Sequence, residues 1–151
     1  MRAVLQRVQK ASVTVDNELV SSINQGFLIL LGVEASDDEK EAEALAKKIS
    51  GLRIFTDEND KMNLSLADVD GEVLVVSNFT LCADCKKGRR PNFERAARGE
   101  TANSLYEYFC RVMENAGVKK VAKGIFGADM KVELLNDGPV TIIIDSQELA
   151  K

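Results

Sequence analysis

The chain of 151 residues is long enough for a buried core, and we expect residues 1–151 to form a single domain. Hydrophobic residues make up 45% and charged residues 29%, which is typical of a soluble globular protein, and the net charge of −4 disfavours a general nucleic-acid coat protein. The chain contains no histidine, which excludes Ser-His-Asp and Cys-His catalysis and leaves only thiolate and carboxylate ligands for any zinc site.

Two features of the sequence indicate where the protein resides. The longest apolar run, residues 27–31, is far too short to cross a bilayer, and residues 1–7 carry a charge and lack a signal-peptide core. Three cysteines, an odd number without a secretory signal, favour reduced thiols over a disulfide framework. We therefore expect a cytoplasmic protein that does not enter a membrane.

The first part of the chain predicts strands. Residues 3–8 form the first, and a hairpin follows in which Val13, Val15 and Leu19 alternate with polar residues about the turn at residues 16–17. Residues 26–33 are continuously apolar, which predicts a strand covered on both faces.

A helix is predicted next. Ser36 followed by Glu39 is typical of a capping box, and Gly51 is the expected C-terminal stop. Four apolar residues share one helical face, and two basic residues occupy the last turn: Ala42, Leu45, Ala46 and Ile49, then Lys47 and Lys48.

Two further strands follow this helix. Residues 52–55 predict a short strand that ends in the polar turn at residues 57–60, and residues 73–76 predict a buried strand that ends at Ser77.

A second helix and two last strands complete the pattern. The helix has Thr101 as its expected cap and Gly117 just beyond its end, and its apolar stripe consists of Leu105, Phe109, Val112, Met113 and Ala116. Residues 130–135 and 140–145 predict two apolar strands. The elements together predict an α/β domain with antiparallel strands and two long helices.

Hydroxyl and amide groups gather where one buried strand ends, at Ser77, Asn78 and Thr80, with Phe79 between them. In a structural interpretation, the hydroxyls satisfy local backbone groups and Phe79 packs in the core. In a catalytic interpretation, exposed amides and hydroxyls polarise a carbonyl and stabilise its oxyanion. Thr80 is also a candidate nucleophile, although no base lies near it in the sequence.

Residues 136–139, with the sequence Asn-Asp-Gly-Pro, separate the last two predicted strands. Proline fixes φ and lacks an N–H, so its simplest role here is to set a turn. A Gly138-Pro139 bond held cis, at an intrinsic cost of about 0.5–1 kcal/mol, would instead direct its carbonyls where a trans turn cannot. Such a rigid element could screen a ligand by its shape.

Two other patterns have weaker implications. Lys86, Lys87, Arg89 and Arg90 form a basic segment that is either a solvated surface or a phosphate-contacting loop. Cys82 and Cys85 have the C-x-x-C spacing, but Cys110 alone completes no tetrahedral set. We therefore attribute that spacing to chance and expect no metal and no cofactor.

The motifs resemble those of the D-aminoacyl-tRNA deacylases. Residues 77–83 (S-N-F-T-L-C-A) are similar to the family motif S-Q-F-T-L-x-A, and residues 136–141 (N-D-G-P-V-T) match N-x-G-P-V-T. Family-like segments at residues 4–8, 11–13, 88–93 and 124–130 extend the resemblance over the full chain. Asn78 is the clear departure, because the family usually has Gln there.

This resemblance implies a D-aminoacyl-tRNA deacylase-like fold, a single domain of largely antiparallel, barrel-like sheet with two long helices. It implies an enzyme that hydrolyses the ester of D-aminoacyl-tRNA, and also of wrongly charged glycyl-tRNA, as a proofreading step in translation. It further implies a homodimer whose sites lie at the subunit interface. Each site would combine residues 77–83 of one chain with Gly138-Pro139 of the other.

The resemblance also implies roles for single residues. The carbonyls of a cis Gly138-Pro139 would exclude L side chains, with Arg7, Met130, Asn78 and Asn136 supporting or lining the pocket. Ser77 and the main-chain N–H groups of Phe79 and Thr80 would stabilise charge, while the 2′-hydroxyl of the terminal adenosine assists water. Attack by the Thr80 hydroxyl is the competing mechanism, and the basic segment would contact acceptor-stem phosphates.

Three other functions remain open from the sequence. A non-catalytic RNA-binding module would use the same basic loop, but only 5% of the residues are aromatic and no base-stacking platform is evident. A thiol redox protein would depend on Cys82 and Cys85. An editing domain of related fold that removes an L-amino acid from tRNA would need a pocket open to L side chains.

Overall fold

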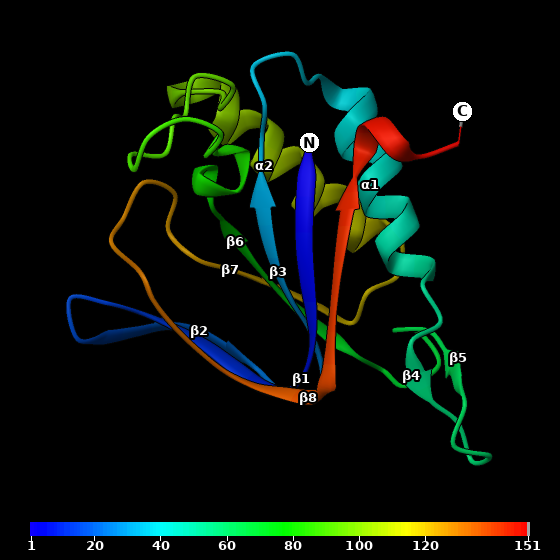
Figure 1. Ribbon diagram of the computed structural model, residues 1–151. Helices are drawn as coiled ribbons and strands as arrows, with labels where there is room; N and C mark the ends of the chain where they lie inside the picture. The colour runs from blue at the N-terminus through cyan, green and yellow to red at the C-terminus, as the bar shows by residue number, and fades with distance from the viewer. Residues whose placement is uncertain (151) are drawn as a thin grey trace.

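The sheet is built around β1 (Arg2–Val15), a long strand with neighbours on both edges in this computed structural model, which describes residues 1–150. β8 (Lys131–Asp145) pairs with one edge of β1. β3 (Gly26–Gly32) pairs with the first half of the other edge and β2 (Glu18–Ile23) with the second half, all antiparallel. β1 and β8 bend together, so the sheet curls (Figure 1). The predicted N-terminal hairpin is confirmed, but the strand predicted at residues 3–8 and the first hairpin strand form one strand, β1.

β6 (Glu72–Ser77) and β7 (Lys120–Lys123) extend the sheet beyond β3 and run parallel to it. Parallel neighbours require crossover connections, and these contain α1 (Glu39–Gly51) and α2 (Gly99–Asn115). The Ser21 hydroxyl of β2 donates to the Lys123 carbonyl of β7 at 2.7 Å, which draws the sheet toward a barrel. The expected α/β fold is confirmed, with the parallel pairs confined to β3, β6 and β7.

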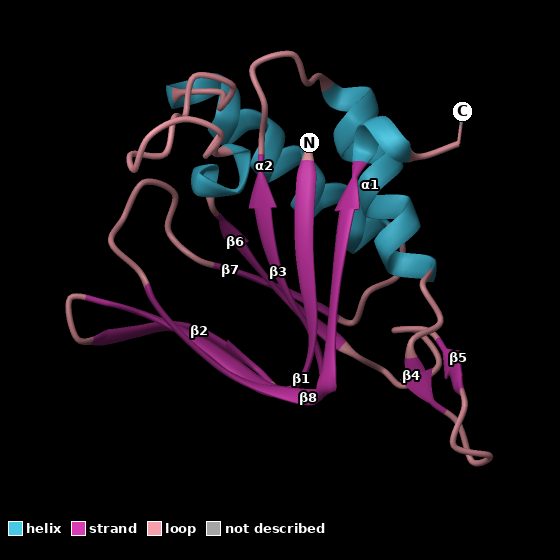
Figure 2. Cartoon of the chain, in the orientation of Figure 1, coloured by secondary structure: helices cyan, strands magenta, loops and turns pink. Residues whose placement is uncertain are grey.

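Apolar layers cover both faces of β3 and β6, as their continuous apolar sequences predict. Figure 2 shows both long helices on one side of the strands, where Phe27, Ile29 and Val75 pack with them. Leu28 and Leu74 point to the other face and pack inside the curl of the sheet. No helix within residues 1–150 is long and apolar enough to cross a membrane.

The start of α1 differs from the prediction. Asp38 rather than Ser36 is the N-cap: its carboxylate accepts a hydrogen bond from Lys40 N, and Glu41 accepts one from Asp38 N, both at 2.8 Å. The start is displaced because Asp37 is buried and accepts hydrogen bonds from the Met1 amino group and from Glu34 N. The predicted apolar face is buried, and the helix ends at Gly51.

The start of α2 was also predicted wrongly. The helix begins at Gly99, Arg98 occupies the cap position without a capping side chain, and Thr101 lies within the first turn. Gly99 has a φ of +57°, a conformation that suits glycine. Gly117, at +87°, follows the helix end as predicted.

The strand predicted at residues 52–55 is mostly wrong. β4 covers only Phe55–Thr56 and pairs with β5 (Met62–Leu64) around the predicted polar turn. The carbonyl of Ile54 is taken up by a side chain, because it accepts a hydrogen bond from Arg7 Nη1 at 2.8 Å.

The last two predicted strands form one strand, β8, in which Gly138-Pro139 does not reverse the chain. Pairing with β1 continues on both sides: Thr141 lies opposite Gln6 and Asn136 opposite Val8, with a register shift between them. The extra residues are accommodated as an irregularity of the ladder. The Gly138-Pro139 bond is cis. The interpretation as a turn between two strands is therefore wrong.

Candidate active site

A cavity of about 720 Å³ opens beyond the carboxyl end of β6. Its wall includes Ser77, the last residue of β6, and part of the short 3-10 turn η1 (Phe79–Cys82). The start of α2 and the loop before β8, including Met130, complete the lining. Ligands of α/β proteins commonly bind outside the carboxyl ends of parallel strands. The structure therefore brings five predicted site residues together here: Ser77, Asn78, Phe79, Thr80 and Met130.

Asn78 organises the start of η1. Its side-chain oxygen accepts hydrogen bonds from Thr80 N, at 3.3 Å, and from the Thr80 hydroxyl. Its own N–H donates to the Leu31 carbonyl at 2.8 Å, which anchors the turn to β3. A neutral carboxamide oxygen does not remove a proton from a hydroxyl. The Thr80 hydroxyl therefore donates to a neutral acceptor, which is not a base that would activate it as a nucleophile.

The cavity is mainly apolar. Phe79 is 55% exposed, so the interpretation that it packs in the core is wrong. Its ring contacts Phe93 edge to face, with centroids 5.2 Å apart, and both rings line the cavity. Arg98 and Asp129 add one charge of each sign to the lining. An apolar pocket with a few polar groups is typical of a site for a small organic moiety.

A second group of predicted residues surrounds Gly138-Pro139. Both residues of this dipeptide are exposed. Arg7, only 8% exposed, donates through Nε to the Asp137 carbonyl at 3.2 Å and through Nη1 to Ile54. Asn136 Nδ2 donates to the carbonyls of Arg7 and Val140 at 2.9 and 3.0 Å. The dipeptide is therefore exposed, and hydrogen bonds from Arg7 and Asn136 hold the residues on either side of it.

The two groups lie at opposite ends of the sheet. Arg7 is opposite Phe27, near the start of β3, whereas Ser77 is level with Leu31, near its end. The cavity lining, drawn from residues 1–150, contains neither Arg7 nor any residue of the 136–139 segment. Within one chain, the predicted site residues therefore form two separate clusters.

The basic segment lies beside the cavity end of the molecule. Lys86, Lys87, Arg89 and Arg90 are exposed on a loop that follows η1. Reciprocal main-chain hydrogen bonds of 2.8 and 2.9 Å between Asp84 and Asn92 join the two ends of the loop. The four basic side chains are therefore exposed on a loop whose two ends are joined by hydrogen bonds.

The cysteines do not form a disulfide or a candidate metal site in the described chain. Cys82 is buried and Cys85 is exposed. Burial, reinforced by the Glu34 charge, raises the pKa of the Cys82 thiol, and burial raises the pKa of Cys110 to about 12. No cluster of three potential metal ligands occurs in residues 1–150. Both buried thiols are thus protonated and poorly reactive near neutral pH.

Two features of the site were not predicted from the sequence. Phe93 contacts Phe79 across an irregular loop, and no periodicity signals such a contact. The capping role of Asn78 does have a sequence signal, since Asn commonly accepts a hydrogen bond from the N–H two residues later.

Comparison with known proteins places the chain among deacylases of aminoacyl-tRNA. The family model for D-Tyr-tRNA(Tyr) deacylase matches residues 4–145. A D-aminoacyl-tRNA deacylase of Dictyoglomus turgidum is 56% identical over 151 residues, covering 100% of this chain and 96% of the relative. One of Clostridioides difficile is 56% identical over 148 residues, covering 98% and 99%.

Solved structures agree with the fold. A c-Myc DNA Unwinding Element Binding Protein has a TM-score of 0.89 at 41% identity and covers 96% of this chain and 98% of its own. A probable eukaryotic D-amino acid tRNA deacylase has a TM-score of 0.79 at 19% identity, which supports the fold alone, with coverage of 95% and 97%. From the family match and the full-length relatives together, the chain belongs to the D-Tyr-tRNA(Tyr) deacylase family.

Proposed function

We propose that this protein is a D-aminoacyl-tRNA deacylase, a hydrolase that cleaves the ester between a D-amino acid and tRNA. The products are free tRNA and the D-amino acid, so the reaction is a chiral proofreading step in translation, and glycyl-tRNA is a second substrate. The observation that carries the proposal is the placement of residues 77–80 of the family motif on the wall of the cavity. The site of action is the cytoplasm, where charged tRNA occurs.

The chemistry requires no protein base. The chain has no histidine, and the Thr80 hydroxyl donates to the side-chain oxygen of Asn78. An aminoacyl ester is already activated, so a water molecule assisted by the 2′-hydroxyl of the terminal adenosine can attack it. The protein then has to orient the ester and stabilise the oxyanion that forms.

Main-chain groups of η1 are the proposed oxyanion donors. Thr80 N donates to Asn78 Oδ1 over a long 3.3 Å, which is a weak hydrogen bond. An anionic ester oxygen is a stronger acceptor than a neutral amide. The developing oxyanion therefore takes over the Thr80 N–H from Asn78, with Phe79 N beside it. The shorter Asn side chain, in place of the usual Gln, retains this capping contact in the unliganded protein.

Chirality is read by a second copy of the chain. Enantiomers have equal hydrophobicity, so discrimination depends on where the side chain points and what it strikes. Gly138-Pro139 is exposed and does not line the cavity of its own chain, so we assign it to the cavity of a partner. In the proposed homodimer, its carbonyls stand against the position that an L side chain would occupy.

Features of β8 are consistent with a covered face. Among the described strands β8 pairs only with β1, which leaves its other edge without a strand partner. Ile143 and Leu135 on this strand are 68% and 47% exposed. An open strand edge bearing large apolar side chains is typical of a surface that a partner covers.

A paired cleavage assay tests the function. Purified protein is given tRNA charged with D-tyrosine or L-tyrosine, and the remaining ester is measured with time. We expect rapid loss of the D-ester and retention of the L-ester. Ala128→Trp, which fills the cavity from a half-buried position on its wall, is the matched control and should abolish cleavage.

The same assay separates the alternatives. Cleavage of the L-ester instead would identify an editing domain for L-amino acids, and binding without cleavage would identify an RNA-binding module. Replacement of Cys82 and Cys85 by Ser with full retention of cleavage would eliminate a thiol mechanism.

A further inference from the structure

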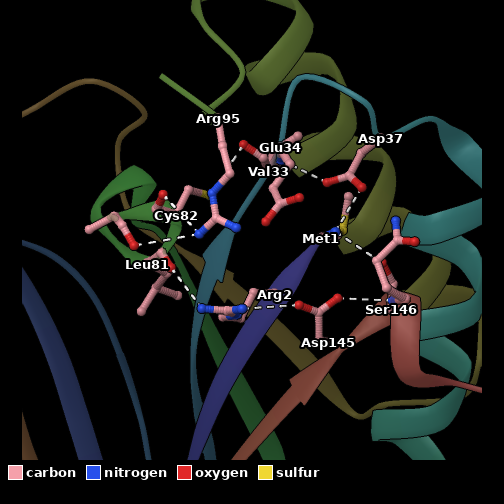
Figure 3. A network of polar contacts seen from close by, with 12 residues as sticks. Met1, Arg2, Val33, Glu34, Asp37, Leu81, Cys82, Arg95, Asp145 and Ser146 are labelled. Atoms are coloured by element: carbon pink, nitrogen blue, oxygen red, sulfur yellow. Dashed lines mark hydrogen bonds and ion pairs between the residues drawn. The ribbon is translucent and has the colours of Figure 1, made fainter. Parts of the chain in front are cut away.

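η1, the turn that carries Phe79 and Thr80, is held by side chains outside the cavity lining. Arg2 Nη1 donates to the Leu81 carbonyl at 3.3 Å, and its Nη2 donates to Asp145 Oδ2 at 3.2 Å. Figure 3 shows the Arg2 guanidinium lying between these two acceptors. Arg95 Nη2 lies 3.5 Å from the next two carbonyl oxygens, those of Cys82 and Ala83. Three consecutive carbonyls at the end of η1 therefore meet guanidinium groups.

The sheet beneath η1 leaves the turn little room. A Cβ added to Gly32 would lie 2.9 Å from the Leu81 Cβ and 3.2 Å from the Asn78 carbonyl oxygen. Gly32 is the direct strand partner of Arg2. The close approach at Gly32 sets the distance of η1 from the sheet, and Arg2 fixes the direction of its last carbonyl groups.

Asp145 holds Arg2 in place. One carboxylate oxygen accepts from Arg2 and the other from Gln147 N at 2.9 Å, and the side chain is 15% exposed. Arg2 Nε is buried and has no hydrogen-bond partner in the described chain. An unpaired buried donor is destabilising, so stability alone does not explain a guanidinium at this position.

We propose that Arg2, held by Asp145, is a positioning residue for ester hydrolysis. η1 has only 4 residues, so fixing the Leu81 carbonyl also fixes the main chain of Phe79 and Thr80 at the cavity wall. The inference rests on the proposed function, in which these main-chain groups stabilise the oxyanion. Arg2 acts through the turn and does not touch the substrate.

Kinetics of Arg2→Met, Arg2→Lys and Asp145→Asn on D-tyrosyl-tRNA test this role. A misplacement of about 1 Å can cost about 100-fold in rate, and we expect Arg2→Met to lower kcat by at least about tenfold with little change in KM. Lys reaches one of the two acceptors and should restore part of kcat. Asp145→Asn keeps an oxygen for Gln147 N but loses the charge, so an intermediate kcat is expected.

Hydrogen exchange of the main-chain amides supplies a readout that needs no substrate. In Arg2→Met the amides of residues 79–83 should exchange faster while those of α1 do not change. Arg53→Met is the matched control, because Arg53 also donates to a carbonyl, that of Asn63 at 2.8 Å, but in the β4–β5 hairpin. It should leave kcat and the exchange of residues 79–83 unchanged.

The outcomes separate this proposal from the function itself. An unchanged kcat in folded Arg2→Met, or a loss that appears only as a raised KM, would overturn the positioning role. Absence of cleavage by the wild-type protein would reject the proposed function. Unchanged exchange at residues 79–83 would then still reject the placement of η1 by Arg2.

Discussion

The two ends of the curled sheet contrast in construction. At the carboxyl end of β6, residues 77–80 line part of a cavity of about 720 Å³. At the other end Gly138-Pro139 is exposed, and hydrogen bonds of Arg7 and Asn136 hold the neighbouring main chain. The first end has a cavity, and the second has an exposed dipeptide that does not line the cavity within the described residues 1–150.

This contrast is the reason for proposing that the site is divided between two copies of the chain. The family motifs suggest one site, yet a single chain places one motif level with the start of β3 and the other level with its end. A closed, symmetric dimer brings the same two patches together twice. This division is tested most directly by substitutions near Gly138-Pro139 whose effect is measured as ester cleavage in the cavity.

The largest effect is expected from the basic loop at the cavity end. Neutralising Lys86, Lys87, Arg89 and Arg90 to Gln should lower tRNA affinity by at least about 100-fold at low salt and reduce the slope of log K against log salt by about 3. The reason is the loss of positive charge that we expect to contact tRNA phosphates near the cavity. Filter binding over a series of salt concentrations measures both quantities.

Four lysines distant from η1 provide the matched control for charge. Lys47, Lys48, Lys119 and Lys120 are all exposed, and changing them to Gln alters net charge equally. This control should leave the slope nearly unchanged. An equal change in both variants would mean that tRNA does not approach from the cavity end in particular.

The next largest effect is expected when the hydrogen bonds that support Gly138-Pro139 are removed. Arg7→Met removes donors to the buried Ile54 carbonyl and to the Asp137 carbonyl, and should cost about 2–3 kcal/mol of unfolding free energy. The L-ester should also be cleaved faster, since the element loses its support. Urea denaturation at fixed protein concentration measures the first effect.

The exposed Arg53→Met serves as the control for Arg7→Met and should cost no more than about 0.5 kcal/mol. If Arg7→Met is equally mild and keeps full selectivity, the element does not depend on this guanidinium.

A smaller effect, on selectivity alone, tests whether the element acts on a partner. Pro139→Ala removes the ring that restrains the exposed tip, and L-ester cleavage should rise by at least about tenfold, or about 1.4 kcal/mol. Mixing with a large excess of Ala128→Trp then places nearly every Pro139→Ala chain in a mixed dimer. In that mixed dimer the cavity of the Pro139→Ala chain is intact, and the Ala128→Trp chain supplies an intact Gly138-Pro139. L-ester cleavage per Pro139→Ala chain should therefore return toward the wild-type value.

Continued cleavage of the D-ester by the mixture shows that the cavities still function. If L-ester cleavage per Pro139→Ala chain is unaffected by mixing, the element acts within its own chain and the division between copies is wrong.

Elements with regular apolar patterns were predictable from the sequence. The doubly buried β3 follows from a short apolar run bounded by glycines, and the apolar face of α1 follows from its helical spacing. The N-caps of both helices were not predictable. Ser36 and Thr101 are suitable caps by local sequence, but tertiary contacts decide where each helix begins. Asp37 is occupied by the Met1 amino group, and this partner lies 36 residues away.

The residues of the candidate site could be predicted from the sequence, but their arrangement in space could not. Residues 77–80 end a buried strand, so their place on a cavity wall follows from local sequence. The distance between Gly138-Pro139 and this cavity depends on the register of β8 against β1. Local propensity predicts a turn at Gly-Pro, whereas the long pairing of β1 and β8 carries the strand through it.

The smallest effect is expected at Thr80, and it tests what the cavity end contributes to the chemistry. Thr80→Val keeps the shape and the N–H but removes the hydroxyl, which donates to the neutral Asn78 oxygen rather than to a base. We expect kcat on D-tyrosyl-tRNA to change by less than about threefold, whereas loss of a catalytic nucleophile costs orders of magnitude. A loss of that larger size would restore nucleophilic attack by Thr80. A small change, together with the expected fall of kcat in Arg2→Met, would assign catalysis at this end to main-chain geometry.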